Sequence, residues 1–258
     1  MNYSDLLKYL GKYGTTKDDI IEREGFNDIL ENVVIAPWWS HSIFEKHVDK
    51  ITQKTDRVFN IYVDNLEFSF IELKNVGASA ILDDVLSLGV TKCKNLIFIG
   101  SAGAIDDNIK IGDIVIPKYS FCGVGTERYL DKNLEDNFEC KNFPDKKLTE
   151  KILISSKKYT NQANVLHLPN YSVDCVFAQF PHIDHIISLG AKTLEMETST
   201  VFKCSQMTGI KATALLCISD NTTKKKSLYS GRTMQDQEKR YFVRNEIIPK
   251  IIIDTFSK

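Results

Sequence analysis

Short apolar runs alternate with helical patterns along most of this chain, and that alternation restricts the fold more than any other feature. Apolar runs that predict buried strands occupy residues 32–37, 95–99, 112–117, 165–168, 192–196 and 212–219. Helical spacing predicts helices at residues 43–51, 77–89, 148–159, 181–189, 198–208 and 233–256. Two further strands, 57–63 and 66–73, are predicted to form a hairpin. The pattern indicates an α/β fold whose mainly parallel sheet is covered by helices on both faces.

The length and composition fit one sizeable domain. The chain has 258 residues, 43% of them hydrophobic. Residues 1–32 combine helical spacing with a charged stretch and are predicted to form an N-terminal helical cover. The α/β domain is then expected at residues 33–258, without an internal repeat or linker.

Charge and cysteine content argue against several classes of protein. Thirty-three basic residues balance thirty-four acidic ones, so we expect no nucleic-acid partner. No apolar run approaches the roughly 20 residues of a membrane span, and the N-terminus lacks a signal-peptide pattern, which predicts a cytoplasmic protein without membrane contact. The six cysteines lack Cys-x-x-Cys spacing and read as reduced thiols, not as a disulfide framework or a zinc site.

Two carboxylates separated by one methionine stand where a predicted strand becomes a helix. They are Glu195 and Glu197, on either side of Met196. In a parallel α/β sheet, ligands bind at this edge, and an extended chain would send both carboxylates to the same side. A structural alternative is that they interact with the positive end of the following helix.

Two other strands also end in residues suited to ligand binding. Ser101, Ala102 and Gly103 are small enough for backbone N–H groups to approach a ligand closely, although a tight turn would use the same residues. Ser219 and Asp220 end another apolar run, where Asp220 could alternatively cap a turn or helix.

The order of these elements resembles that of the nucleoside phosphorylase superfamily. The resemblance spans residues 33–254 and rests on Gly77-Ala78-Ser79-Ala80, Ile99-Gly100-Ser101-Ala102-Gly103-Ala104, Ile111-Gly112-Asp113-Ile114-Val115-Ile116-Pro117, Gly125-Thr126, Glu195-Met196-Glu197 and Ser219-Asp220. It implies a single α/β domain with a mixed central sheet flanked by helices. It also implies cleavage of the N-glycosidic bond of a nucleoside, and by analogy a homo-oligomer without a metal or other cofactor.

The resemblance implies roles for residues at both ends of a nucleoside. Glu197 matches the glutamate that binds the ribose 2′-hydroxyl, and Met196 matches the methionine on the ribose face. Asp220 matches the aspartate that protonates the purine base, which requires a raised pKa. This match favours a purine nucleoside as the substrate.

The base contacts are less well defined. Val176 takes the place of the usual aromatic residue that lies against the base, and Phe177 follows it, so either could line the pocket. Phe177 could instead belong to the core. Thr126 matches a loop close to the sugar or base.

Departures from the family pattern concern the nucleophile. Trp38, Ser42 and Phe98 occupy the places of a glycine and two arginines that hold phosphate in the phosphorylases. The first-loop glutamates of the nucleosidases are also missing. We therefore expect water as the preferred nucleophile, activated by His41, although His41 could equally be an exposed loop residue.

Three other interpretations remain open at this point. Phosphate could be the co-substrate if Arg128, Arg232 or an arginine from a neighbouring subunit completed its site. A protein that binds nucleosides without cleaving them is an alternative of another class, which Asp220 argues against. His182 and His185 could suggest a metal site, but their three-residue step is more typical of a solvated helix face.

Overall fold

A computed structural model describes residues 1–135 and 137–257. Its α-helices are α1 (Tyr3–Lys12), α2 (Lys17–Glu24), α3 (Ala78–Leu88), α4 (Lys146–Ser156), α5 (Ile183–Ser188), α6 (Thr198–Thr208), α7 (Met234–Phe242) and α8 (Ile248–Phe256). Short 3₁₀ segments are η1 (His41–Phe44), η2 (Thr126–Leu130), η3 (Lys157–Tyr159) and η4 (Phe180–His182), and η5 (Val243–Ile247) is a π-helical turn. The strands are β1 (Asn32–Pro37), β2 (Lys50–Gln53), β3 (Val58–Val63), β4 (Leu66–Leu73), β5 (Asn95–Ala104), β6 (Ile114–Gly123), β7 (Lys141–Asn142), β8 (Val165–Val173), β9 (Thr193–Glu195) and β10 (Lys211–Asn221).

The strands form one mixed sheet that partly closes on itself. Its order is β10-β6-β8-β9-β5-β1-β4-β3-β2, and β10 also pairs with β5, which joins β10, β6, β8, β9 and β5 into a ring. The ring has both parallel pairs, such as β10 with β5, and antiparallel pairs, such as β10 with β6. The mixed sheet implied by the resemblance is thus confirmed, whereas the strand–helix alternation alone pointed to a mainly parallel one.

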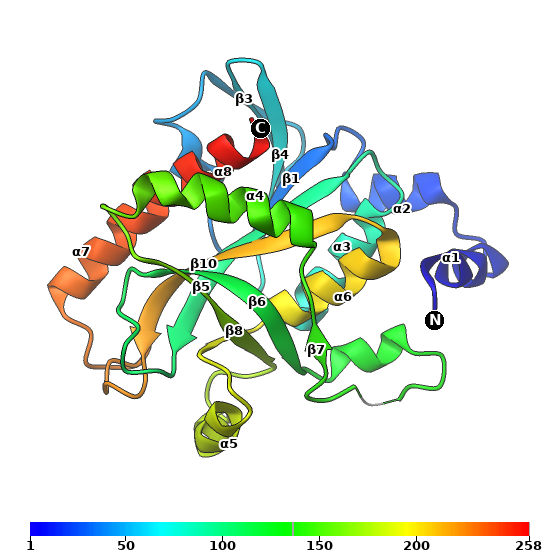
Figure 1. Cartoon of the computed structure of the whole chain (residues 1–258). Coiled ribbons are helices and arrows are strands. Elements are labelled where there is room, and N and C mark those ends of the chain that lie inside the picture. The colour runs from blue at the N-terminus through cyan, green and yellow to red at the C-terminus, as the bar shows by residue number, and fades with distance from the viewer. Residues whose placement is uncertain (136, 258) are drawn as a thin grey trace.

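Apolar side chains on the two faces of the sheet build two cores. Successive residues of a strand point to opposite faces. Leu96 and Phe98 therefore join the core under α3 and α6, and Ile97 and Ile99 join the core under α4 and α8. Figure 1 shows these helix pairs, and within each pair the two helices contact one another. Burial on both faces explains why β5 reads as a continuous apolar run.

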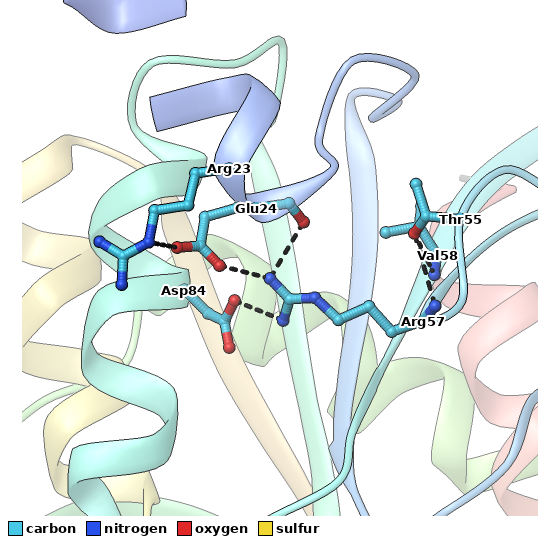
Figure 2. Close-up of polar contacts among 6 residues, drawn as sticks. All are labelled: Arg23, Glu24, Thr55, Arg57, Val58 and Asp84. Carbon is cyan, nitrogen blue, oxygen red and sulfur yellow. Dashed lines mark hydrogen bonds and ion pairs between the residues drawn. The ribbon is translucent and has the colours of Figure 1, made fainter. Parts of the chain in front are cut away.

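A partly buried ion-pair network attaches the N-terminal helix α2 to the sheet and to α3. The Arg57 guanidinium bonds Glu24 Oε2 and Asp84 Oδ1, each at 2.6 Å (Figure 2). Burial raises the pKa of Asp84 to about 6, although Arg57 opposes the shift. Loss of Arg57 would leave the buried Asp84 carboxylate without its ion-pair partner, so this network is expected to contribute to the attachment of α2.

The predicted helix at residues 43–51 is wrong. The chain instead forms the short turn η1 and then the edge strand β2, which pairs antiparallel with β3. Ile43 and Ile51 do turn inward, and their spacing fits either structure, but pairing with β3 decides for a strand.

The final helical region consists of α7, the π turn η5 and α8, and it is longer than any other in the described part of the chain. The π turn interrupts it between the two α-helices. None of the helices described is long and apolar enough to cross a bilayer.

Candidate active site

A cavity of about 390 Å³ lies at the carboxyl ends of β1, β5, β8, β9 and β10, where the sequence predicted ligand-binding residues. This is the edge at which ligands bind in α/β sheets, and the volume is in the range of small-molecule sites. The residues that line the cavity are Pro37, Trp38, Trp39, Val76, Ser101, Gly103, Val173, Val176, Gln179, Leu194, Glu195, Met196, Glu197, Ser219, Asp220, Thr222, Leu228, Arg240 and Arg244.

Glu195 is occupied by hydrogen bonds from the protein itself. One carboxylate oxygen accepts from the Asn170 and Ser172 side chains, and the other accepts from the backbone N–H groups of Glu197 and Thr198, both at 2.7 Å. A carboxylate at this position satisfies N–H groups at the start of α6 and suits the helix dipole. Its main role is therefore to hold the first turn of α6, which was the structural alternative for this carboxylate.

Glu197 is the less satisfied carboxylate of the pair. It is 4% exposed, and one oxygen accepts a hydrogen bond from the Gly77 N–H. Burial, followed by the negative charge of Glu195, raises the pKa of Glu197 to about 8. Gly77 has φ = +100° and faces the Met196 methyl group, so residues on two separate loops define this end of the cavity.

Asp220 reaches the cavity because β10 is irregular at its end. The register with β5 shifts between Ile218 and Asp220, and such a bulge re-aims a side chain. A Cβ at Gly103 would lie 2.9 Å from Asp220 Oδ2, so only glycine allows this approach. Burial raises the pKa of Asp220 despite a hydrogen bond from Ser219 and the charges of Arg232 and Arg240. Asp220 thus has the environment of a proton donor.

Two arginines from the C-terminal helical region line the same cavity. Arg240 donates to Ser101 Oγ at 3.2 Å, and the Arg244 guanidinium lies 5.0 Å from the centre of the Trp39 ring. Neither forms an ion pair with an acidic side chain among the described residues, and the Nε atoms of both are buried without a hydrogen-bond partner. Burial and then the like charge of Arg240 lower the pKa of Arg244. Two half-buried cations without an ion-pair partner among the described residues make this end of the cavity suitable for an anion.

The helix that carries these arginines is interrupted by the π turn η5, which contains Arg244. Pro249 has no N–H to donate to the carbonyl of Asn245, four residues earlier, and His47 Nε2 donates to that carbonyl instead at 2.9 Å. Like charges four residues apart destabilise a helix, and π turns are frequent at functional sites. The local structure therefore supports a functional reason for the arginine pair.

Other residues singled out by sequence lie elsewhere. Four predicted site residues do not line the cavity: His41, Ala102, Thr126 and Phe177. The His41 ring stacks on Phe59 and hydrogen-bonds Glu72 at 2.7 Å, so it is held in a separate hollow near β2. Ala102 points into the core, as expected for the residue between Ser101 and Gly103. Phe177 is 80% exposed, whereas its neighbour Val176 lines the cavity.

The first loop keeps the left-handed backbone conformation that suits the family's glycine, although the residue there is now Trp38. Trp38 stands where the family has glycine, and its φ of +57° is in the left-handed region that favours glycine. Hydrogen bonds from its backbone N–H to the Leu73 carbonyl and from its ring to the Lys74 carbonyl hold it there. Arg128 and Arg232, the predicted sources of a phosphate site, do not line the cavity.

One group of three metal-type ligands lies outside the cavity. The ligand atoms of Cys122, Glu127 and Cys140 are within 4.8 Å of one another. Glu127 already accepts hydrogen bonds from Asn142, Ser199 and Thr200, so its carboxylate is used by the protein. His185, the other metal candidate, bonds Glu139 instead.

Comparison with known proteins places the chain in a family. The sequence model of the phosphorylase superfamily matches residues 75–242. Relatives include DeoD-type purine nucleoside phosphorylases of Hahella chejuensis, 28% identical over 57% of this chain and 58% of that protein, and of Aliivibrio salmonicida, 25% identical over 57% and 59%. The chain thus matches less than two thirds of the length of these relatives.

The fold has a similar counterpart among solved structures. A uridine phosphorylase from Vibrio fischeri superimposes with a TM-score of 0.70 at 15% identity, covering 90% of this chain and 93% of that one. With the family match over residues 75–242, this likeness agrees with the mixed sheet. The chain belongs to the phosphorylase superfamily.

Proposed function

We propose that the protein cleaves the N-glycosidic bond of purine nucleosides by phosphorolysis, releasing the free base and a sugar 1-phosphate. The observation that carries this proposal is that the half-buried guanidinium groups of Arg240 and Arg244 line the cavity with Ser101 and have no acidic ion-pair partner among the described residues. Sequence alone favoured water because the usual arginines are replaced. Arginines from another element now supply the cations that phosphate needs, so we favour phosphate.

Phosphate fits this end of the cavity electrostatically. Ser101 offers a hydroxyl, and Arg244 offers a planar fork of N–H donors. The Arg244 cation also lies over Trp39, in the loop that carries Ser42 in place of an arginine. We propose that Arg244 supplies the positive charge that an arginine at the position of Ser42 provides in the family pattern.

The bond changes require a proton donor at the base and negative charge near the sugar. As the C1′–N bond breaks, its electrons pass to the base nitrogen system, and a phosphate oxygen forms the new bond to C1′. Asp220, whose pKa is raised, gives its proton to the leaving base and is reprotonated from solvent. Glu197 lies with Met196 on the ribose face, and positive charge that develops on the sugar favours the ionised form of its carboxyl, which then stabilises that charge.

Support for a purine comes from Asp220 and from the relatives, which are named purine nucleoside phosphorylases. Val176 and Gln179 line the same cavity and would contact the base.

The proposal is tested by phosphate dependence and by one substitution. With inosine, guanosine and adenosine as substrates, base release should require phosphate. Arg244→Met, which keeps the length of the side chain but removes its charge, should raise the phosphate KM about 10- to 100-fold, the usual value of a charge-assisted hydrogen bond. The nucleoside KM should change much less.

A matched control uses an arginine far from the cavity. Arg23 is 81% exposed on α2, so Arg23→Met removes the same group without touching the site. It should leave both KM values unchanged. Base release at the same rate without phosphate, or an unchanged phosphate KM in Arg244→Met, would overturn phosphorolysis at this site.

A further inference from the structure

Glu127 is a buried carboxylate that neither the sequence motifs nor the proposed chemistry uses. It lies in η2, has no exposed surface, and does not line the cavity. One oxygen accepts from Ser199 Oγ at 2.6 Å and Thr200 Oγ1 at 3.2 Å, and the other accepts from Asn142 Nδ2 at 2.8 Å. Within residues 1–135 and 137–257, no basic side chain forms an ion pair with it. A buried carboxylate held only by neutral donors is costly, which raises the question of what it holds in place.

Two of its three partners, Ser199 and Thr200, belong to the first turn of α6, directly after Glu197. The Ser199 N–H donates to Ser172 Oγ, and the Ser172 hydroxyl donates to Glu195. The first turn of α6 is therefore held by Glu195 through its backbone and by Glu127 through its side chains. Glu197 itself makes no side-chain capping bond to this helix, so its direction depends on how the turn is held.

The segment that carries Glu127 is also connected to the loop that follows β8, here called the base loop because Val176 and Gln179 on it line the cavity. Gly125, immediately before η2, donates its N–H to Asp174 Oδ2 at 2.8 Å. Asp174 begins the loop that brings Val176 and Gln179 to the cavity. Glu127 is thus bonded directly to the helix that carries Glu197 and lies two residues from the anchor of the base loop.

We infer that Glu127 is a positioning residue, which fixes the first turn of α6 and so sets Glu197 relative to the base loop. The inference rests on the proposed function for its kinetic readout only. Asn142 connects Glu127 to α6 a second time, because its side-chain amide donates to Glu127 at 2.8 Å and to Ser199 Oγ at 2.9 Å. Substrate contacts are made by Glu197, not by Glu127.

The test is Glu127→Gln, which keeps the shape but places an amide NH₂ where one oxygen now accepts a bond. The inosine KM should rise about tenfold, the usual effect of losing one hydrogen bond to a charged group. The phosphate KM should stay within about twofold, because Ser101 and Arg244 lie on other elements. In a Glu197→Gln background, the added effect of Glu127→Gln should largely disappear, since residues that act through one another are not additive.

A control separates positioning from general loss of stability. Asp84, on α3, is also a buried carboxylate, but it bonds Arg57 (Figure 2), and neither residue lines the cavity. Asp84→Asn should lower Tm comparably without changing the inosine KM. An equal rise of the inosine KM in both variants, or fully additive effects of Glu127→Gln and Glu197→Gln, would overturn the inference.

A second readout does not depend on catalysis. Hydrogen exchange of the backbone amides of residues 197–201 should be faster in Glu127→Gln than in the wild type, and unchanged in Asp84→Asn. Exchange that is unaltered in Glu127→Gln would overturn the positioning role even in an active enzyme. Absence of phosphorolysis in the wild type would refute the proposed function and leave this exchange result to decide the inference.

Discussion

Replacing Glu197 with Gln should make the protein more stable, and increasingly so as the pH rises. The carboxyl of Glu197 has a pKa of about 8 in the folded protein, against 4.5 for an ordinary glutamate. Between these pH values the folded state retains a proton that the unfolded chain has released. The free energy of unfolding therefore falls as the pH rises through this window.

The size of the effect follows from the two pKa values. At about 1.4 kcal/mol per pH unit, ionising Glu197 in the folded state costs up to about 5 kcal/mol above pH 8. A Gln side chain carries no such penalty and can still accept the hydrogen bond from Gly77. The variant and the wild type should be similarly stable near pH 5. The variant should then gain roughly 10 °C in relative Tm by pH 9.

Thermal unfolding at matched pH values measures this difference directly. Glu150→Gln makes the same chemical change at an exposed position on α4 and should show a Tm difference from the wild type that does not vary with pH. A constant Tm difference between Glu197→Gln and the wild type from pH 5 to pH 9 would refute the burial argument. A protein that keeps so costly a carboxylate does so for function, and the same variant should lose activity.

Three further substitutions test individual parts of the site. Asp220→Asn should reduce purine nucleoside turnover about 10²- to 10⁴-fold with little change in binding, measured by steady-state kinetics, and undiminished turnover would remove its role as an acid. Glu195→Gln should lower the stability by about 1–3 kcal/mol in urea unfolding, because donors that now meet a carboxylate would lose an acceptor, and unchanged stability would contradict its structural role. Gly103→Ala should displace Asp220 and reduce kcat at least about tenfold with little loss of Tm, whereas full activity would show that Asp220 need not approach Gly103.

Most of the strand ends that form the cavity could be predicted from sequence, because each is a local pattern. Glu195, Met196, Glu197, Ser219, Asp220, Ser101 and Gly103 all line the cavity. Each follows an apolar run, and parallel strands bring their carboxyl ends to one edge of the sheet. Even so, the two glutamates could not be distinguished by sequence, because two of the hydrogen bonds to Glu195 come from Asn170 and Ser172 on another strand.

The arginine pair could not be placed because its position depends on contacts distant in sequence. Arg240 and Arg244 stand four residues apart in the final helix, which was the only local signal. Whether they faced solvent or the cavity was decided by how that helix packs on the sheet and by the π turn before Pro249. His41 is the converse case: its position in the first loop pointed to catalysis, but bonding to Glu72 holds it in a separate hollow.

The most direct test of the account is to identify the sugar product by ³¹P nuclear magnetic resonance. Purified protein would be incubated with inosine and inorganic phosphate, with Arg244→Met as the comparison. The account predicts a ribose 1-phosphate signal that grows in step with hypoxanthine release and is strongly reduced in the variant. Release of hypoxanthine with free ribose, and no new phosphorus signal, would contradict it.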